Sequence, residues 1–220
     1  MSVSNLSTGL RPGVCLSTTR PTAPYTGQTI FETDTNKMLV WNSTAWVIPN
    51  QTTQNPEGLE LVKVQTVGSG VGSVTVPDAF SATYHNYKIV YSGGVSSAFT
   101  DTIMYLGGTM PADGYYASLV HGVFSSGSAI NAGTINGQYI RYLGISASGV
   151  MSIAIEVNSP FESKITTITS PHVYTSSGGY AGIQVGFHNS SASFTSFTLM
   201  PANGTFTGGT VKVYGYRNSL

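Results

Sequence analysis

Short strand-type segments separated by turn-forming residues are the feature that most restricts the fold of this chain. From Leu59 onward, segments such as LELVKVQTV, YKIVYSG, MSIAIEV and YAGIQVGFH are rich in β-branched and aromatic residues, which favour strands. Gly, Pro, Asn, Ser or Asp separates them at intervals of roughly ten to fifteen residues, a spacing typical of antiparallel sandwiches and barrels. No apolar stripe at helical spacing persists beyond about two turns. The sequence therefore predicts an all-β chain.

The last segment, GTVKVYGY, shows the two-residue period of a half-buried strand almost without interruption. Residues 58–220 are predicted to form an antiparallel β-sandwich of about ten strands with a jelly-roll-like arrangement. The interval from Ser125 to Gly137, SSGSAINAGTING, has no apolar pattern. We expect it to be a surface loop, where a sandwich commonly carries recognition residues.

Residues 1–57 form a separate N-terminal part in this prediction. Residues 1–18 are polar and contain Gly9, Pro12 and Gly13, so we expect an extended arm. The segments GQTIFET, MLVWN and AWVIP then predict a three-stranded β-meander, and NQTTQNPEG has the composition of a linker. Three short strands bury too little apolar surface to be stable alone.

The charge content excludes some partners and permits others. Charged residues make up 8% of the chain, against about 25% in an ordinary soluble protein. Nine basic and nine acidic residues give a net charge of zero, and no basic cluster is present to bind nucleic acid. A surface with so little charge tolerates tight assembly between copies.

Cysteine content and hydropathy exclude several further classes. The single cysteine, Cys15, rules out an internal disulfide framework and a cysteine-based zinc site, and we expect a partly buried, inert thiol. The N-terminus has no apolar run of signal-peptide length. No window approaches the roughly 20 apolar residues of a membrane span. We expect synthesis in a cytoplasm and no membrane insertion.

Catalytic and metal-binding patterns are weak throughout the sequence. The nucleophile-elbow pattern G-x-S-x-G is absent. Glu156 alternates with Ile153 and Ile155, so it is expected in solvent rather than in a pair of catalytic acids. No two histidines share an element, although a sandwich could bring two of them together; the four are His85, His121, His172 and His188. We expect neither an enzyme nor a cofactor or metal site.

Two adjacent tyrosines are the candidates for a ligand site. Tyr115 and Tyr116 follow Gly114 and lie close to Pro111. Tyrosine offers a flat face and a hydroxyl group to a sugar or a protein. The alternative is that both pack on a half-buried sheet as ordinary strand residues, which is the expectation for Tyr214 and Tyr216.

The stretch RPTAPYTGQTIFETDTNKMLVWNSTAWV, residues 20–47, contains both tryptophans of the chain. It resembles an N-terminal module of virion proteins of tailed bacteriophages. The shared frame is R-P-x-x-P-Y-x-G-Q-x-I-[FY]-[ED]-T-D-T followed by W-N-x-x-x-W. The closing GTVKVYGYR also resembles the last strand of small phage β-sandwich proteins. The rest of the chain carries no such likeness.

The resemblance implies a non-enzymatic virion component, commonly a homotrimer, attached to the particle by its N-terminal part. The main prediction is a capsid decoration or cement protein on the virion surface, with the major capsid protein or a tail or adaptor protein as partner. The attachment residues are then expected to be Tyr25, Ile30, Phe31, Trp41 and Trp46. A short tail or head fibre that binds host-surface glycan is the alternative, and a free carbohydrate-binding domain or enzyme is a third hypothesis.

Overall fold

The computed structural model describes residues 12–49, 58–146, 151–174 and 179–217. The chain divides into two compact units, Met1–Asn55 and Pro56–Leu220. The predicted boundary after residue 57 falls at residues 50–57, outside the described part. Every regular element of the described residues is a strand, which confirms the all-β prediction. Within the same ranges, no helix is long and apolar enough to cross a membrane.

The N-terminal unit contains one small sheet. Its strands lie in the order β1 (Gly13–Cys15), β2 (Thr29–Glu32), β3 (Lys37–Trp41) and β4 (Trp46–Val47). β2, β3 and β4 pair antiparallel and form the expected meander. β1 pairs parallel with β2, so the prediction of an extended arm over residues 1–18 is wrong at Gly13–Cys15. This segment joins the sheet through its backbone groups, and its side chains need no strand pattern to do so. Residues 1–11 lie outside the described part.

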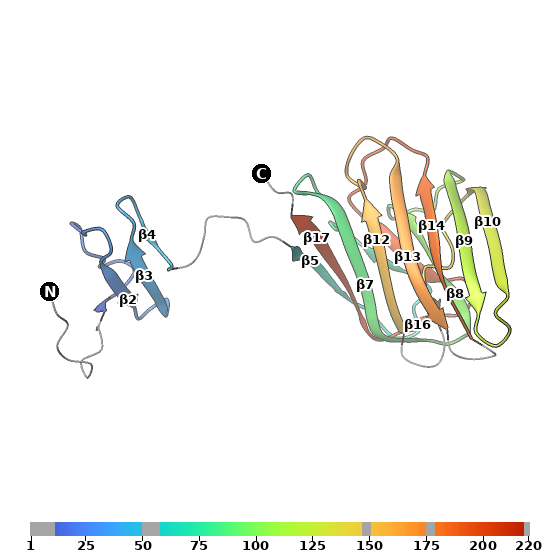
Figure 1. The fold of residues 1–220 in the computed structure, drawn as a ribbon, viewed down its shortest axis with the longest axis horizontal. Helices are drawn as coiled ribbons and strands as arrows, with labels where there is room; N and C mark the ends of the chain where they lie inside the picture. Colours follow the sequence, from blue (N-terminus) through green and yellow to red (C-terminus); the bar gives the residue numbers. More distant parts are fainter. Residues whose placement is uncertain (1–11, 50–57, 147–150, 175–178, 218–220) are drawn as a thin grey trace. The chain divides into compact units, whose positions relative to one another are not determined.

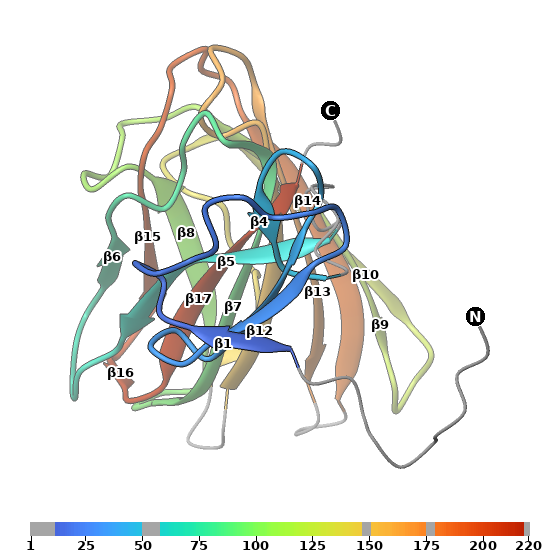
Figure 2. The ribbon, with the colours of Figure 1, turned by 90° about the vertical axis from the view of Figure 1, so that its left-hand side faces the viewer.

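The second unit has two layers (Figures 1 and 2). The larger sheet runs in the order β10 (Ala129–Gly137), β9 (Tyr115–Val123), β14 (Tyr180–His188), β13 (Thr166–Tyr174), β12 (Met151–Asn158), β7 (Tyr84–Ser96), β17 (Thr210–Arg217) and β5 (Leu59–Thr66), with β16 (Phe206–Thr207) also paired to β7. The smaller sheet contains β11 (Ile145–Ser146), β8 (Thr100–Leu106), β15 (Phe197–Pro201) and β6 (Val74–Val76). Their described pairings are antiparallel, as expected for a sandwich. A jelly-roll arrangement stays a prediction.

The core lies between the two layers and follows the two-residue period of the strands. On β12, Ile153 and Ile155 are buried. Glu156 lies on the opposite face, as expected, where it binds Lys88 at 3.3 Å. Phe80, which follows β6, joins the layers: its ring lies 4.8 Å from that of Tyr87 on β7 and 5.6 Å from that of Phe197 on β15.

The interval from Ser125 to Gly137 is not the surface loop that we expected. Residues 129–137 form β10, the edge strand that pairs with β9. Most of its side chains are exposed. Strand pairing uses backbone groups alone, so an exposed edge strand needs no apolar period, and the sequence pattern could not reveal it.

Tyr115 is a core residue and not part of a ligand-binding loop. It begins β9, and its ring is fully buried in the sandwich core. Its hydroxyl oxygen accepts a hydrogen bond from the Leu106 N–H at 2.6 Å. Burial raises the pKa of this phenol far above its ordinary value. The prediction that Tyr115 contacts a ligand is therefore wrong.

Replacement of Tyr115 by Phe is expected to destabilise the sandwich by about 1–3 kcal/mol, because it leaves the Leu106 N–H buried without a partner. Urea unfolding monitored by circular dichroism measures this change. Tyr116→Phe is the matched control, since the Tyr116 hydroxyl donates only an exposed, 3.3 Å hydrogen bond to Asn136. Equal stability of the two variants would contradict a structural role for the Tyr115 hydroxyl.

Candidate functional site

The two tryptophans form a cross-strand pair within the N-terminal unit. Trp41 on β3 lies opposite Trp46 on β4, with ring centroids 5.6 Å apart in an edge-to-face arrangement. The Asn42 Oδ1 atom accepts hydrogen bonds from the backbone N–H groups of Thr44 and Ala45 at 2.9 and 2.8 Å. The spacing W-N-x-x-x-W therefore encodes a hairpin whose asparagine closes the turn. Both indoles are half-buried.

An ion pair between exposed Arg20 and buried Glu32 holds the segment before β2 against the sheet. Glu32 is fully buried, and the Arg20 guanidinium donates a hydrogen bond to its Oε1 atom. Thr35 Oγ1 donates to the Oε2 atom at 2.7 Å. These two hydrogen bonds lower the pKa of Glu32 below its ordinary value of 4.5, and the bond from Arg20 has the larger effect. Three residues of the phage-like frame thus have a structural role.

Ile30 lies on the same face of the sheet as Glu32 and cannot be an attachment residue. It is paired with Leu39 on β3, and both side chains are buried within the unit. Its prediction as a contact residue is wrong because residue 30, two positions from Glu32, must point to the covered face.

The opposite face of the N-terminal sheet is apolar and open within its unit. Val14, Phe31 and Met38 are neighbours across β1, β2 and β3, and they point away from Ile30. Val14 is 69% exposed and Met38 is 47% exposed, while Phe31 is half-buried. Val40 and Val47 continue the row. We call these five residues the open face.

Tyr25 is the most accessible of the predicted attachment residues. It is 71% exposed and lies in the turn before β2, where Gly27 adopts a φ of +87° that other residues rarely adopt. The Tyr25 carbonyl accepts a hydrogen bond from the Gln28 N–H. The turn of the P-Y-x-G-Q frame thus holds an aromatic ring in solvent.

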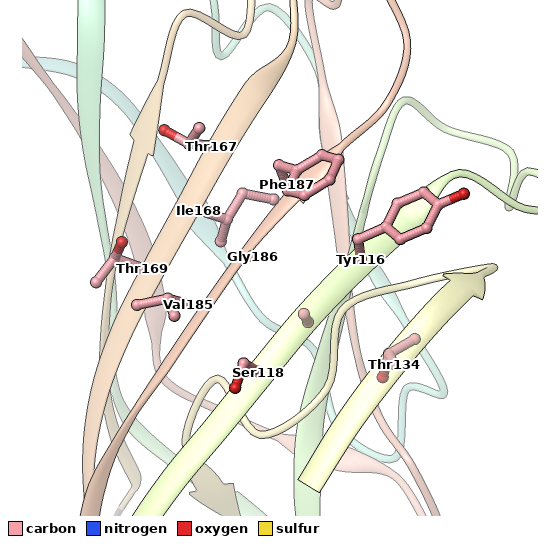
Figure 3. A pocket seen from close by; sticks show the side chains of 10 residues that line it. Tyr116, Ser118, Thr134, Thr167, Ile168, Thr169, Val185, Gly186 and Phe187 are labelled. Atoms are coloured by element: carbon pink, nitrogen blue, oxygen red, sulfur yellow. The ribbon is translucent and has the colours of Figure 1, made fainter.

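Tyr116 lines a groove on the outer face of the large sheet (Figure 3). Its ring stacks on that of Phe187 on β14, with centroids 5.1 Å apart and planes at 10°. The groove has a volume of about 520 Å³ and is also lined by Ser118, Thr134, Thr167, Ile168, Thr169 and Val185. No lining residue is charged. Such a surface suits an apolar side chain of a protein or the flat face of a sugar ring.

Three acidic side chains of the sandwich bind basic side chains. Asp101 accepts two hydrogen bonds from Arg141, at 2.8 and 3.0 Å. Glu162 binds Lys164 and His85, and Glu156 binds Lys88. Each of these three carboxylates thus has at least one basic side chain as a partner.

Two of the four histidines come together in space. His121 on β9 and His172 on β13 have ring centroids 5.9 Å apart. His188 instead packs against the ring of Tyr115 at 4.4 Å, and its burial lowers its pKa. In the described ranges, no group of three or more His, Cys, Asp or Glu side chains could hold a metal ion.

Comparisons with known proteins add no family to this description. No protein-family model matches the chain, and no curated protein or solved structure is significantly similar to it.

Acid is expected to unfold the N-terminal unit. The pKa of Glu32 is lower in the folded unit than in the unfolded chain, so the stability it contributes is complete above pH 4.5 and is lost as the pH falls through the lowered value. Asp34, whose pKa is lowered by hydrogen bonds from Ser17, acts in the same direction. The only two tryptophans of the chain lie in this unit, so indole fluorescence reports the transition.

The Glu32→Gln variant is the control for this acid transition. It lacks the titrating carboxylate, so its fluorescence should change less between pH 5 and pH 2 than that of the wild type. An unchanged transition in this variant would show that Glu32 does not link stability to pH.

Proposed function

We propose that this chain is a non-enzymatic structural protein of a tailed-bacteriophage virion, attached to the particle by its N-terminal unit. The observation that carries the proposal is the open face of the N-terminal sheet. Exposed apolar neighbours in one row are typical of a protein contact. The resemblance of residues 20–47 to phage modules supports the same conclusion.

The open face is the centre of the proposed contact, and Tyr25 is a further anchor. Phe31 supplies the large aromatic group that such contacts commonly use, and Val14 and Met38 flank it. We expected Trp41 and Trp46 to be the main anchors. They lie on the other face of the sheet, where their rings pack against each other. They contribute to attachment by keeping the hairpin rigid.

The proposed role in the particle is capsid decoration by a homotrimer that stabilises the virion surface. The outer face of the large sheet supports lateral contacts between copies. Three exposed aliphatic residues lie on β5 at one edge, namely Leu59, Leu61 and Val64. Because the net charge of the chain is zero, charge repulsion does not prevent these contacts or contact with the major capsid protein.

A short tail or head fibre that binds host-surface glycan is the second candidate. The observation that favours it is the stacked pair of Tyr116 and Phe187 in the outer groove. An aromatic surface of this kind can pack against the apolar face of a sugar ring.

The abundance of the chain in purified virions separates the two roles. A decoration protein is expected in numbers comparable with those of the major capsid protein, because it covers the shell. Densitometry of a stained gel of purified particles measures this ratio. A chain present at only a small fraction of the capsid protein would contradict the decoration role, and its absence from particles would contradict both roles.

A charge placed on the open face is expected to prevent attachment. Met38→Lys should reduce incorporation into particles about tenfold or more, since contact would bury an unpaired ammonium group. Thr44→Lys, on the exposed turn between β3 and β4, is the matched control and should be incorporated normally. Immunoblots of purified particles measure both variants. Normal incorporation of Met38→Lys would contradict the proposed contact.

A further inference from the structure

A second pocket lies against the inner face of the large sheet, at the ends of β9, β13 and β14. It has a volume of about 260 Å³. The sheet contributes His121, His172 and Tyr180; Phe99, Thr100, Asp101, Arg141 and Tyr142 form the rest of the wall. This pocket shares no residue with the outer groove around Tyr116.

A glycine creates the space between the two histidines. Gly182 on β14 is paired with His121 on one side and His172 on the other. A Cβ atom at Gly182 would lie 2.4 Å from the Cβ of His121, which no side chain can tolerate. The imidazoles therefore face each other across a residue without a side chain, and the His121 ring stacks on Tyr180 at 4.7 Å.

The histidines have hydrogen-bonding capacity that the described protein atoms do not use. His121 is 8% exposed and His172 is 6% exposed, yet both ring nitrogens of His121 and the Nδ1 atom of His172 are buried without a hydrogen-bond partner. The Oε1 atom of Gln184, on the same inner face, is in the same condition. Buried polar groups without partners are costly and rare. The imidazole nitrogens of His121 and His172 lie at one pocket, which indicates a polar occupant.

The two opposite charges at the pocket bind each other. The charge of Arg141 is cancelled by Asp101, which it binds through two hydrogen bonds, and its guanidinium lies 5.1 Å from the centre of the Tyr142 ring. Burial, together with the nearby His121, lowers the pKa of His172, so this imidazole is uncharged at neutral pH. Neither Asp101 nor Arg141 is therefore an unpaired charge that could replace the hydration of an ionic ligand.

Two imidazoles alone make a poor metal site. A zinc site commonly has at least three protein ligands, and none of the described His, Cys, Asp or Glu side chains completes a group of three. The volume of about 260 Å³ also exceeds the roughly 30 Å³ share of one water molecule. The pocket therefore has room for an occupant larger than a single ion or water.

We propose that this pocket binds one neutral sugar residue. Each hydroxyl group of a sugar both donates and accepts hydrogen bonds, so sugar hydroxyls can be partners for the ring nitrogens of His121 and His172. The Thr100 hydroxyl and the Asp101–Arg141 pair offer further polar partners. Phe99, which is 55% exposed, supplies a flat apolar surface at the pocket for the C–H face of the sugar.

This inference goes beyond the structural role and does not depend on how many copies the particle carries. Glucose, galactose, mannose, N-acetylglucosamine and N-acetylgalactosamine are the probes, each added to the full-length chain and observed by saturation-transfer NMR. At least one is expected to bind and to shift the imidazole resonances of His121 and His172. The charged sugar N-acetylneuraminic acid is expected not to bind.

Three variants test where the sugar binds. His121→Ala and Phe99→Ala should each weaken binding about tenfold, the effect of losing one good hydrogen bond or apolar contact. Phe99 is exposed, so its variant should fold even if the histidine variant does not. Tyr116→Ala, in the outer groove, should bind the sugar as the wild type does.

Three results would overturn the proposal. The first is that none of the five neutral sugars binds the wild-type chain. The second is that Tyr116→Ala abolishes binding while Phe99→Ala does not, which would place the sugar in the outer groove. The third is that ZnCl₂ shifts both imidazoles at micromolar concentration and no sugar does, which would make the pocket a metal site.

Discussion

The ion pair between exposed Arg20 and buried Glu32 marks the covered face of the N-terminal sheet. It fixes the segment before β2 against the face that carries Ile30 and Leu39. A buried carboxylate needs such a partner, because an unpaired charge away from water is very costly. Ile30, Glu32 and Leu39 are buried on this face, whereas Val14 and Met38 on the opposite face are exposed. The proposed attachment through Val14, Phe31 and Met38 rests on this arrangement.

In the sandwich, too, one face of the large sheet is mainly apolar and buried, and the other carries both polar and apolar side chains. Phe80 and the alternating aliphatic residues of β7, β12 and β17 fill the space between the layers. Beside the second pocket, His121 and His172 are buried with ring nitrogens that have no hydrogen-bond partner among the described protein atoms. A polar group in a core is destabilising unless it has a partner, so this departure from the pattern is where a ligand is expected.

The alternation of apolar and polar residues predicted those strands that have one buried face. GTVKVYGY and MSIAIEV alternate because one face of each strand is buried, so their strands were evident from the sequence. β1 and β10 were missed, since both are held mainly by backbone pairing at a sheet edge.

Tyr115 and Tyr116 are adjacent and therefore face opposite sides, which makes one a core residue and the other part of a groove. The meeting of His121 and His172 depends on the register with Gly182, which no local pattern reveals.

Hydroxyl-radical footprinting with mass spectrometry tests most directly whether another polypeptide covers the open face. The purified chain at low concentration is compared with the same chain in intact particles, with exposed Tyr25 and Met38 as reporters on the N-terminal unit and exposed Phe124 on the sandwich. Strong protection of Met38 in the particle, absent in the dilute chain, is the predicted result. Equal labelling of Met38 in both samples would show that the open face stays in solvent, and the proposed attachment would be wrong.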